Sequence, residues 1–442
     1  MEKNLLALVE QAGVVGAGGA GFPTHIKLKA QADTVIINGA ECEPLLRVDQ
    51  QLMAGQAPQL LAALSLMVEQ VGAKAGIIAL KQKYQAAISA LTEFLPQYPK
   101  LSLHQLGNFY PAGDEQVLVY EVLGRIVPEG GIPLLVGAVV VNVETALNVY
   151  RAYSEEAPVT DTYVTLAGAV RAPKTVLAPL GITVGEVLQL AGGPILPDYQ
   201  IIDGGPMMGD TVTPEHLIGK TTKGLIVLPA GHPLLLSLNK QLSRTLKEAC
   251  VACMQCSLCT MVCPRGLLGH KLAPHKLMRL TAYGRLCEFG QTPLSAYLCC
   301  GCRLCEYACV MGLQPWKLNN SLKEALDAQG QKNNLHNKPE KTDPFREFLR
   351  YPVNKLIMQL GLVAYDVPAP LEYKRHVFNK VTIPLKQHSG APALPIVQAG
   401  DIVARGDLIA RIPDGLISAN IHASISGRVN AVTAESINIE SI

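Results

Sequence analysis

Eleven of the twelve cysteines in this 442-residue chain fall between residues 250 and 309, in two runs of equal spacing. The runs are Cys253, Cys256, Cys259 and Cys263, then Cys299, Cys302, Cys305 and Cys309, with gaps of two, two and three residues. Three cysteines at two-residue gaps can wrap a loop around one iron–sulfur cube, while the fourth begins a helix that leads toward another cube. The spacing therefore predicts two [4Fe–4S] clusters. We expect the first to use Cys253, Cys256, Cys259 and Cys309, and the second to use Cys299, Cys302, Cys305 and Cys263.

Two other uses of these cysteines are weaker. A zinc site would use four ligands, commonly two separated Cys-x2-Cys pairs, and needs no doubled run. Disulfides require an oxidising compartment, whereas the start of the chain, MEKNLLALVEQAG, carries acidic residues and lacks the apolar stretch of a secretory signal. We therefore predict a soluble, cytoplasmic protein that binds iron–sulfur clusters.

The register of the first run has one alternative. Cys250 also precedes Cys253 by a two-residue gap, so a run shifted by three residues is possible. Pro264, directly after Cys263, favours the register given above, although Val310 takes the equivalent place after Cys309. Three cysteines are then spare and expected to be buried as small apolar side chains, namely Cys250, Cys287 and Cys300.

A glycine-rich stretch near the start, GVVGAGGAGFPTHIK (residues 13–27), is a second candidate for chemistry. It contains G-x-G-x-x-G at Gly16, Gly18 and Gly21, but a dinucleotide-binding loop should follow a strand and open a helix. Here a helical pattern precedes the glycines and Pro23 follows them. A plain turn is one interpretation. The glycines together with Lys27 favour a backbone cradle for a phosphate.

The elements that must position these residues indicate several α/β units. A content of 49% hydrophobic and 17% charged residues is typical of folded domains, and a net charge of +2 favours neither nucleic acid nor membrane. Strands are expected at 33–39, 75–80 and 136–143, with a long helix at about 50–70. We predict an α/β domain at 1–155, a β-rich module with one helix at 156–236, a helical cysteine-bearing segment at 237–330, a linker at 331–381 and an all-β unit at 382–442. No apolar run is long enough to span a bilayer.

Four motifs in order give a family resemblance: GAGGAGFPTHIK, NGAECEP (38–44), YPAGDE (110–115) and NVETALNV (142–149). Together they resemble the FMN-binding domain of the NADH-oxidising subunit of respiratory complex I and of the Rnf complex C subunit. The resemblance implies non-covalent FMN, bound by Gly16, Gly18, Gly19, Phe22, Lys27, Asn38, Ala40, Glu41, Tyr110, Gly113, Asp114, Asn142 and Thr145. It also implies that Glu43 and Phe22 face the nicotinamide ring of NADH as catalytic residues. The chain departs from the complex I pattern at Ala17, where arginine is usual, and at Asp114, where glutamate is usual.

The resemblance extends beyond this domain. The 156–236 module resembles the soluble-ligand-binding β-grasp (SLBB) domain, and 382–442 resembles a barrel-sandwich hybrid of the lipoyl/biotinyl type. Carrier versions of that unit need a lysine at a hairpin tip, and Lys386 is the last lysine in the sequence. We therefore expect a structural or docking unit with no swinging arm.

The flavin domain comes first and the barrel-sandwich unit last, and the cysteine segment contains CPRGLLGHKLAPHKLMR (263–279). In this order, in its length and in that stretch, the whole chain resembles the PduS-type cobalamin reductases of propanediol-utilising microcompartments. That resemblance implies electron transfer from NADH through FMN and two clusters to cob(III)alamin or cob(II)alamin, for adenosylcobalamin regeneration. It further implies an adenosyltransferase and a microcompartment shell protein as partners, and a place inside the microcompartment. Two alternatives remain: an Rnf-type electron-input subunit of a membrane ion pump, and an iron–sulfur docking protein with a vestigial flavin site.

Overall fold

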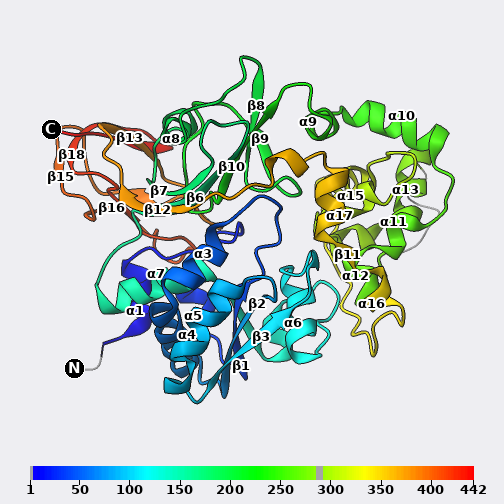
Figure 1. Ribbon diagram of the computed structural model, residues 1–442, viewed down its shortest axis with the longest axis horizontal. Helices are drawn as coiled ribbons and strands as arrows, with labels where there is room; N and C mark the ends of the chain where they lie inside the picture. Colours follow the sequence, from blue (N-terminus) through cyan, green and yellow to red (C-terminus); the bar gives the residue numbers. More distant parts are fainter. Residues whose placement is uncertain (1–2, 285–291) are drawn as a thin grey trace.

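The computed structural model of the chain describes residues 3–284 and 292–442, so the spare cysteine Cys287 lies outside the described residues. The structure is mixed α/β with several sheets, as predicted. The N-terminal sheet and its helices form one side of the molecule, and the green β-grasp strands lie above them in Figure 1. The helices that carry the cysteines lie at one end, and the C-terminal strands lie at the opposite end beside the β-grasp unit (Figure 1).

The N-terminal sheet is parallel and buried on both faces. Its strands are β1 (Thr34–Gly39), β2 (Ala75–Lys81), β3 (Leu101–Leu106) and β5 (Ala138–Asn142), in the order β3-β2-β1-β5. On one face Val35 and Ile37 pack with α4 (Ala57–Val71) and α7 (Val143–Ser154). On the other face Ile36 packs with α6 (Glu115–Leu123). Burial on both sides explains why these strands are continuous apolar runs in the sequence.

The helix predicted at 50–70 is two helices. The first is α3 (Val48–Gly55) and the second is α4, and the chain leaves helical geometry at Gln56 between them. Pro58 is the reason, because proline has no N–H to give to the preceding turn and is tolerated only in the first turn of a helix. The break turns α3 toward the end of β1.

The strand order creates a switch point beside β1. The chain runs from β1 outward through β2 and β3, then returns to place β5 on the other side of β1. Connections that leave adjacent parallel strands in opposite directions open a crevice at their carboxyl ends, where ligands bind. The motifs NGAECEP and NVETALNV follow β1 and β5 respectively, so both motifs reach this crevice.

The β-grasp unit is a six-stranded sheet of order β12-β7-β6-β10-β8-β9 with one helix, α8 (Val184–Leu190). Five strands come from the predicted module: β6 (Asp161–Gly168), β7 (Lys174–Pro179), β8 (Tyr199–Asp203), β9 (Asp210–Val212) and β10 (Gly224–Pro229). The sixth, β12 (Leu371–Arg375), comes from the segment expected to be a linker. The loop between β8 and β9 reaches the N-terminal domain.

The cysteines lie among short helices. They are α10 (Leu242–Ala252), α11 (Leu258–Met261), α12 (Pro264–Leu267), α13 (Pro274–Tyr283), α14 (Leu304–Tyr307) and α15 (Pro315–Ala328). Leu277 on α13 and Leu322 on α15 share a small buried core with Cys263. The helices thus pack around the cysteine loops.

Much of the 331–381 segment has regular structure. It contains α16 (Arg346–Leu349), β11 (Tyr351–Pro352) and α17 (Val353–Gln359) before β12. Strand β11 pairs with β4 (Phe109–Tyr110) of the N-terminal domain. The pairing holds this segment against the motif YPAGDE.

The C-terminal unit consists of two small sheets. One contains β13 (Lys380–Pro384), β15 (Ile402–Val403), β18 (Gly427–Val432) and β19 (Ser436–Glu440); the other contains β14 (Leu394–Pro395), β16 (Leu408–Arg411) and β17 (Ile421–His422). The loop after β13 contacts the glycine-rich stretch: the Ser389 amide donates to the Gly21 carbonyl at 3.0 Å, and its Oγ donates to the Ala20 carbonyl at 2.6 Å. This unit therefore supports the outside of the glycine loop.

Lys220 joins three units at one buried point. Its Nζ donates to the Gly13 carbonyl at 2.7 Å and to the Asn420 carbonyl at 2.8 Å, and the residue is 2% exposed. We expect Lys220→Met to leave two carbonyls without a donor, at about 1–3 kcal/mol each. The thermal midpoint should fall by several degrees and proteolysis should release the C-terminal unit sooner. Lys29→Met, an exposed change close to the same loop, is the control. Unchanged stability and proteolysis would show that Lys220 does not join these units.

Candidate flavin and iron–sulfur sites

A cavity of about 830 Å³ lies at the carboxyl ends of β1 and β5. That volume is within the range of cofactor sites. Twelve of the thirteen residues predicted to contact flavin line it: Gly16, Gly18, Gly19, Phe22, Lys27, Asn38, Glu41, Tyr110, Gly113, Asp114, Asn142 and Thr145. The thirteenth, Ala40, is fully buried behind the wall. The structure thus brings four motifs that are distant in sequence to one cavity.

Hydrogen bonds hold the glycine loop in a shape that is open toward the cavity. The Gly16 amide donates to the Phe22 carbonyl at 2.9 Å, and the Ala17 amide donates to Thr145 Oγ1 at 2.8 Å. Gly19 has a φ of +109°, and a Cβ there would meet no atom of the described residues within 4 Å. This conformation suits glycine and leaves room for a phosphate against the backbone.

Several polar groups around the cavity lie on the ends of the strands. Lys27 Nζ donates to the Val140 carbonyl at 2.9 Å and lies 3.3 Å from Glu115 Oε1. Asn38 Nδ2 donates to the Gly113 carbonyl at 2.9 Å. Asn142 Oδ1 accepts from the Glu144 amide at 3.0 Å, capping α7. These contacts fix the side chains that the resemblance assigns to the flavin.

Asp49 is a cavity residue that the sequence did not point to. Its Oδ2 accepts from the Asn142 side chain at 2.8 Å, while its buried Oδ1 has no partner among the described residues. Burial raises the pKa of this carboxyl to about 7. A buried acceptor without a donor fits a site where the hydroxyls of a ligand supply the missing hydrogen bonds. Only the folding of α3 against β1 brings Asp49 here, because no motif contains it.

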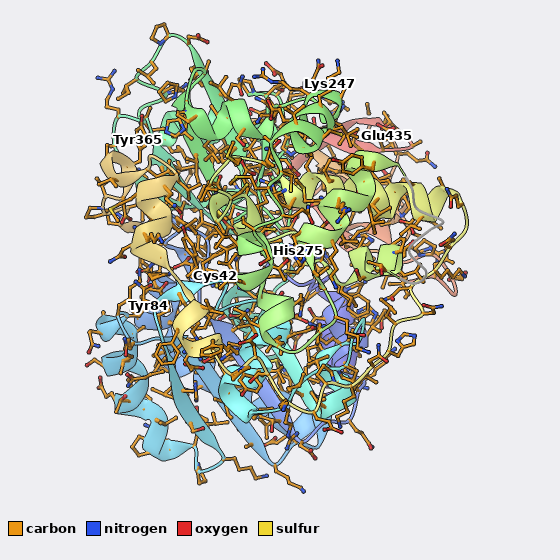
Figure 2. The ribbon with its side chains drawn as sticks, turned by 90° about the vertical axis from the view of Figure 1, so that its right-hand side faces the viewer. Cys42, Tyr84, Lys247, His275, Tyr365 and Glu435 are labelled. Carbon is orange, nitrogen blue, oxygen red and sulfur yellow. The ribbon has the colours of Figure 1, made fainter. Side chains whose placement is uncertain are left out.

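Glu41 has a different role from that of its neighbours. Its carboxylate accepts from the Asp49 amide and the Gln50 side chain, both at 2.8 Å, at the start of α3. Lys81 Nζ and the Tyr84 hydroxyl reach the Glu41 carbonyl at 3.2 and 3.4 Å. Tyr84 and Cys42 are labelled in Figure 2, above the N-terminal sheet. Glu41 lines the cavity but its carboxylate is occupied with holding α3.

Glu43 lies beneath the β8–β9 loop. Its Oε2 accepts from the Met207 amide at 2.8 Å, and its buried Oε1 has no partner in the described part of the chain. A Cβ on Gly205 would lie 2.1 Å from this carboxylate, so glycine is needed for the close approach. Both Glu43 and Phe22 line the cavity, while their roles toward a nicotinamide stay predictions.

The Glu43 environment gives a pH prediction. Burial raises the pKa of Glu43 from 4.5 to about 7, opposed in part by the Met207 amide. The folded chain then binds more protons than the unfolded chain between pH 4.5 and 7, so stability falls as pH rises through that window, by at most about 1.4 kcal/mol per pH unit. We expect Glu43→Gln to be more stable than the parent at pH 8, by about 1–3 kcal/mol. At pH 5.5 this difference in stability should be smaller.

Thermal midpoints at both pH values measure this difference, and Glu69→Gln on the surface of α4 is the control. A Glu43→Gln protein that is less stable than the parent at pH 8 would contradict the shift. It would mean that the ionised carboxylate is already satisfied in the fold.

The first group of cysteines surrounds one small cavity. Cys253, Cys256, Cys259 and Cys309 all line it, together with His275 and exposed Met254 and Val310. His275 is labelled on the helical side of the molecule in Figure 2. Cys309 belongs to the second run of the sequence, so the structure brings the fourth cysteine of one run to the other run's loop.

The second group contains Cys263, Cys299, Cys302 and Cys305. Burial raises the pKa of the Cys305 thiol, and the neighbouring Cys299 and Cys263 raise it further. Burial likewise raises the pKa of Cys263 to about 12, with Cys300 and Cys299 contributing. Iron would supply the positive charge that such buried sulfurs need as ligands.

The two cysteine loops have the same backbone shape. Gln255 and Ser257 have φ of +54° and +63°, and the equivalent Gly301 and Arg303 have +69° and +60°. A left-handed residue other than glycine costs roughly 1–2 kcal/mol, so Gln255, Ser257 and Arg303 at these matching positions indicate a functional constraint. A loop that curls around a cube is such a constraint, and it begins at Cys253 and Cys299.

The spare cysteines differ from one another. Cys250 is on α10, outside the curled loop, and is exposed, so the expectation that it is buried is wrong. Its Sγ donates to the Ala282 carbonyl at 3.0 Å. Cys300 is half-buried and lines the large cavity. Cys42 accepts from the Gly113 amide at 2.5 Å, and burial raises its pKa to about 11.

The flavin cavity and the second cysteine group adjoin. Cys300 and Cys302 line the cavity, and the Tyr110 hydroxyl donates to the Cys302 carbonyl at 3.0 Å. Cys259 of the first group and Cys305 of the second pack together against Trp316. FMN accepts a hydride as two electrons and can release them singly. The order of sites therefore suits transfer from the cavity to the second group and then to the first.

Four family models match the chain. The Nuo51 FMN-binding domain matches residues 9–151, the SLBB domain 163–211, the 4Fe-4S dicluster domain 252–314 and the RnfC barrel sandwich hybrid domain 373–441. They confirm the predicted fold class and the cofactors FMN and iron–sulfur clusters. No helix in the described ranges combines the length and apolarity that a membrane crossing needs.

Two individual proteins are also similar to the chain in sequence. The chain is 45% identical to the cobalamin reductase PduS of Citrobacter freundii, over 98% of this chain and 95% of that one. It is 34% identical to the C subunit of the Na(+)-translocating ferredoxin:NAD(+) oxidoreductase complex of Acetobacterium woodii, over 58% and 57% of the two chains. A solved NAD+-reducing [NiFe]-hydrogenase aligns with a TM-score of 0.48 at 20% identity, covering 75% of this chain and 63% of that one.

Proposed function

The chain belongs to the PduS cobalamin reductase family, and on that basis we propose that it transfers electrons from NADH to the cobalt of cobalamin. It is a flavin and iron–sulfur reductase. The proposal adds the donor, NADH, and the acceptor, cob(III)alamin or cob(II)alamin. Reduced cobalamin would pass to an adenosyltransferase for adenosylcobalamin regeneration, inside a microcompartment whose shell protein the chain contacts.

One observation carries the electron path. Cys300 and Cys302 line the same cavity as Gly16, Gly19 and Lys27, so a flavin held by the glycine loop would adjoin the second cysteine group. We propose the thirteen flavin contacts and eight cysteine ligands given above as the site residues. Glu43 and Phe22 are proposed to face the nicotinamide, with the β8–β9 loop excluding water from above them.

The test is anaerobic reduction of cobalamin by the purified chain. Protein loaded with FMN and iron is mixed with NADH and cob(III)alamin, and the cobalamin absorbance is followed. We expect reduction that depends on both NADH and the protein. Reduction with dithionite-reduced protein but not with NADH would contradict the proposed donor, and failure with both would contradict the proposed acceptor.

The Rnf-type function is a second candidate because a component of an ion-translocating oxidoreductase aligns with more than half of the chain. That alternative predicts no cobalamin reduction by the isolated chain and electron transfer only with membrane partners. A vestigial flavin site, the third possibility, predicts that purified protein takes up no FMN. Cobalamin reduction and FMN uptake, measured on the same purified protein, therefore distinguish the three functions.

A further inference from the structure

Arg265 lies between the flavin cavity and the second cysteine group. It is in the first turn of α12, two residues after Cys263, and its Nη2 donates to Asp114 Oδ2 at 2.8 Å. The Arg265 side chain is 11% exposed and that of Asp114 is 12% exposed. Burying such a pair has a large desolvation cost, so it is weak support for stability alone. A role in the neighbouring sites is the better explanation.

Asp114 is a fixed anchor for the guanidinium. Its Oδ1 accepts from the Gln116 and Val117 amides, both at 3.1 Å, as the N-cap of α6. Asp114 also lines the large cavity. One end of the Arg265 guanidinium is therefore held by a carboxylate whose other oxygen is tied to the start of a helix.

The other end of the guanidinium lacks an acceptor. Nη1 is buried and has no hydrogen-bond partner among the residues that the structure describes. Cysteine side chains lie near this end: Cys263 precedes Arg265 by two residues, and Cys300 and Cys302 line the same cavity as Asp114. An unpaired buried donor is costly, more so when it is charged. The missing acceptor therefore lies on the cysteine side.

We propose that Arg265 tunes the second cluster: Nη1 donates a hydrogen bond to a sulfur of that cluster, and the positive charge favours its reduced form. Hydrogen bonds to the sulfurs and the local charge are among the factors that set the reduction potential of such clusters. The ion pair with Asp114 then limits the effect, because the carboxylate opposes the guanidinium. The inference rests on the proposed ligands Cys263 and Cys302, but not on the identity of the donor or acceptor.

The test is a redox titration of the loaded protein with dithionite and dye mediators, followed by electron paramagnetic resonance. Arg265→Gln should lower the potential of the second cluster while the first changes much less. Asp114→Asn should raise it, because it removes the opposing negative charge. Arg265→Lys, which keeps the charge, should stay closer to the parent than Arg265→Gln.

The matched control is Arg346→Gln. Arg346 is also buried, with a side chain 5% exposed, and pairs with Glu121 on the same helix α6. The Arg346→Gln variant should leave the reduction potentials of both clusters unchanged. An Arg265→Gln protein with full iron and unshifted potentials would overturn the proposal, as would equal shifts in both clusters or the same shift from Arg346→Gln. If Arg265→Gln does not load iron, Asp114→Asn decides: an upward shift supports the proposal and no shift overturns it. Neither NADH nor cobalamin takes part, so a failed cobalamin assay leaves this result standing.

Discussion

Cys263→Ser should disrupt the second iron–sulfur cluster while the first keeps its ligands. Cys263 follows the first run in sequence but lies with Cys299 and Cys305 in space. Serine is a poor ligand for iron in such a cluster, so the second cluster should be lost or its signal changed. Iron should fall from about eight toward about four per chain, by analogy with two-cluster ferredoxins. Iron analysis and electron paramagnetic resonance of the purified protein measure this loss.

Cys250→Ser is the matched control, because Cys250 is outside the curled loop on α10. It should retain close to eight irons, and Cys300→Ser should do the same. Loss of a cluster from Cys250→Ser but not from Cys259→Ser would mean that the register is shifted by three residues. Loss of the first cluster alone from Cys263→Ser would mean that the two runs do not cross.

Gly19→Val should abolish flavin binding while the iron content is kept. Gly19 lines the cavity, and a Cβ there would meet no described residue within 4 Å. A valine there would block the phosphate from the backbone donors. Losing two charge-assisted hydrogen bonds costs roughly 3–6 kcal/mol, which weakens binding by a factor of about 100 or more. Flavin fluorescence after gel filtration and a binding titration measure the effect.

Backbone strain needs its own control, because Gly19 has a φ of +109°. Gly400 has a φ of +100° and equally open surroundings among the described residues, but it lies in the C-terminal unit. Gly400→Val should therefore cost similar strain and retain flavin. If Gly19→Val retains one flavin per chain, the glycine loop is not the phosphate site. If both variants lose flavin, strain and not obstruction is the cause.

The chemistry of the site was predictable where one short motif carries it. The spacing of Cys253 to Cys263 predicted a curled loop, and the left-handed Gln255 and Ser257 show such a loop. The glycine loop and the ends of β1 and β5 were predictable for the same reason, since their motifs are local. The fold class followed from the apolar runs of strands that are buried on both faces.

What the sequence missed depends on contacts between distant segments. Asp49 reaches the cavity because the start of α3 is held beside the end of β1, where the Asp49 amide donates to Glu41, and no motif contains Asp49. Met207 covers Glu43 from a different unit, 164 residues later in the chain. Cys300 was expected to be a packing residue, yet it lines the flavin cavity because Tyr110 holds its loop there.

The contact between Ser389 and the glycine loop has a consequence for the order in which the protein is made. The Ala20 carbonyl accepts from Ser389 Oγ, which lies 369 residues further along the chain. During synthesis the loop leaves the ribosome early, but its support arrives only when the C-terminal strands have folded. Domains generally fold from the N-terminus during synthesis. Here one of the first segments made is supported by one of the last. Tight flavin binding would therefore require the full-length chain. Chains that end early would lack the cofactor that starts electron flow.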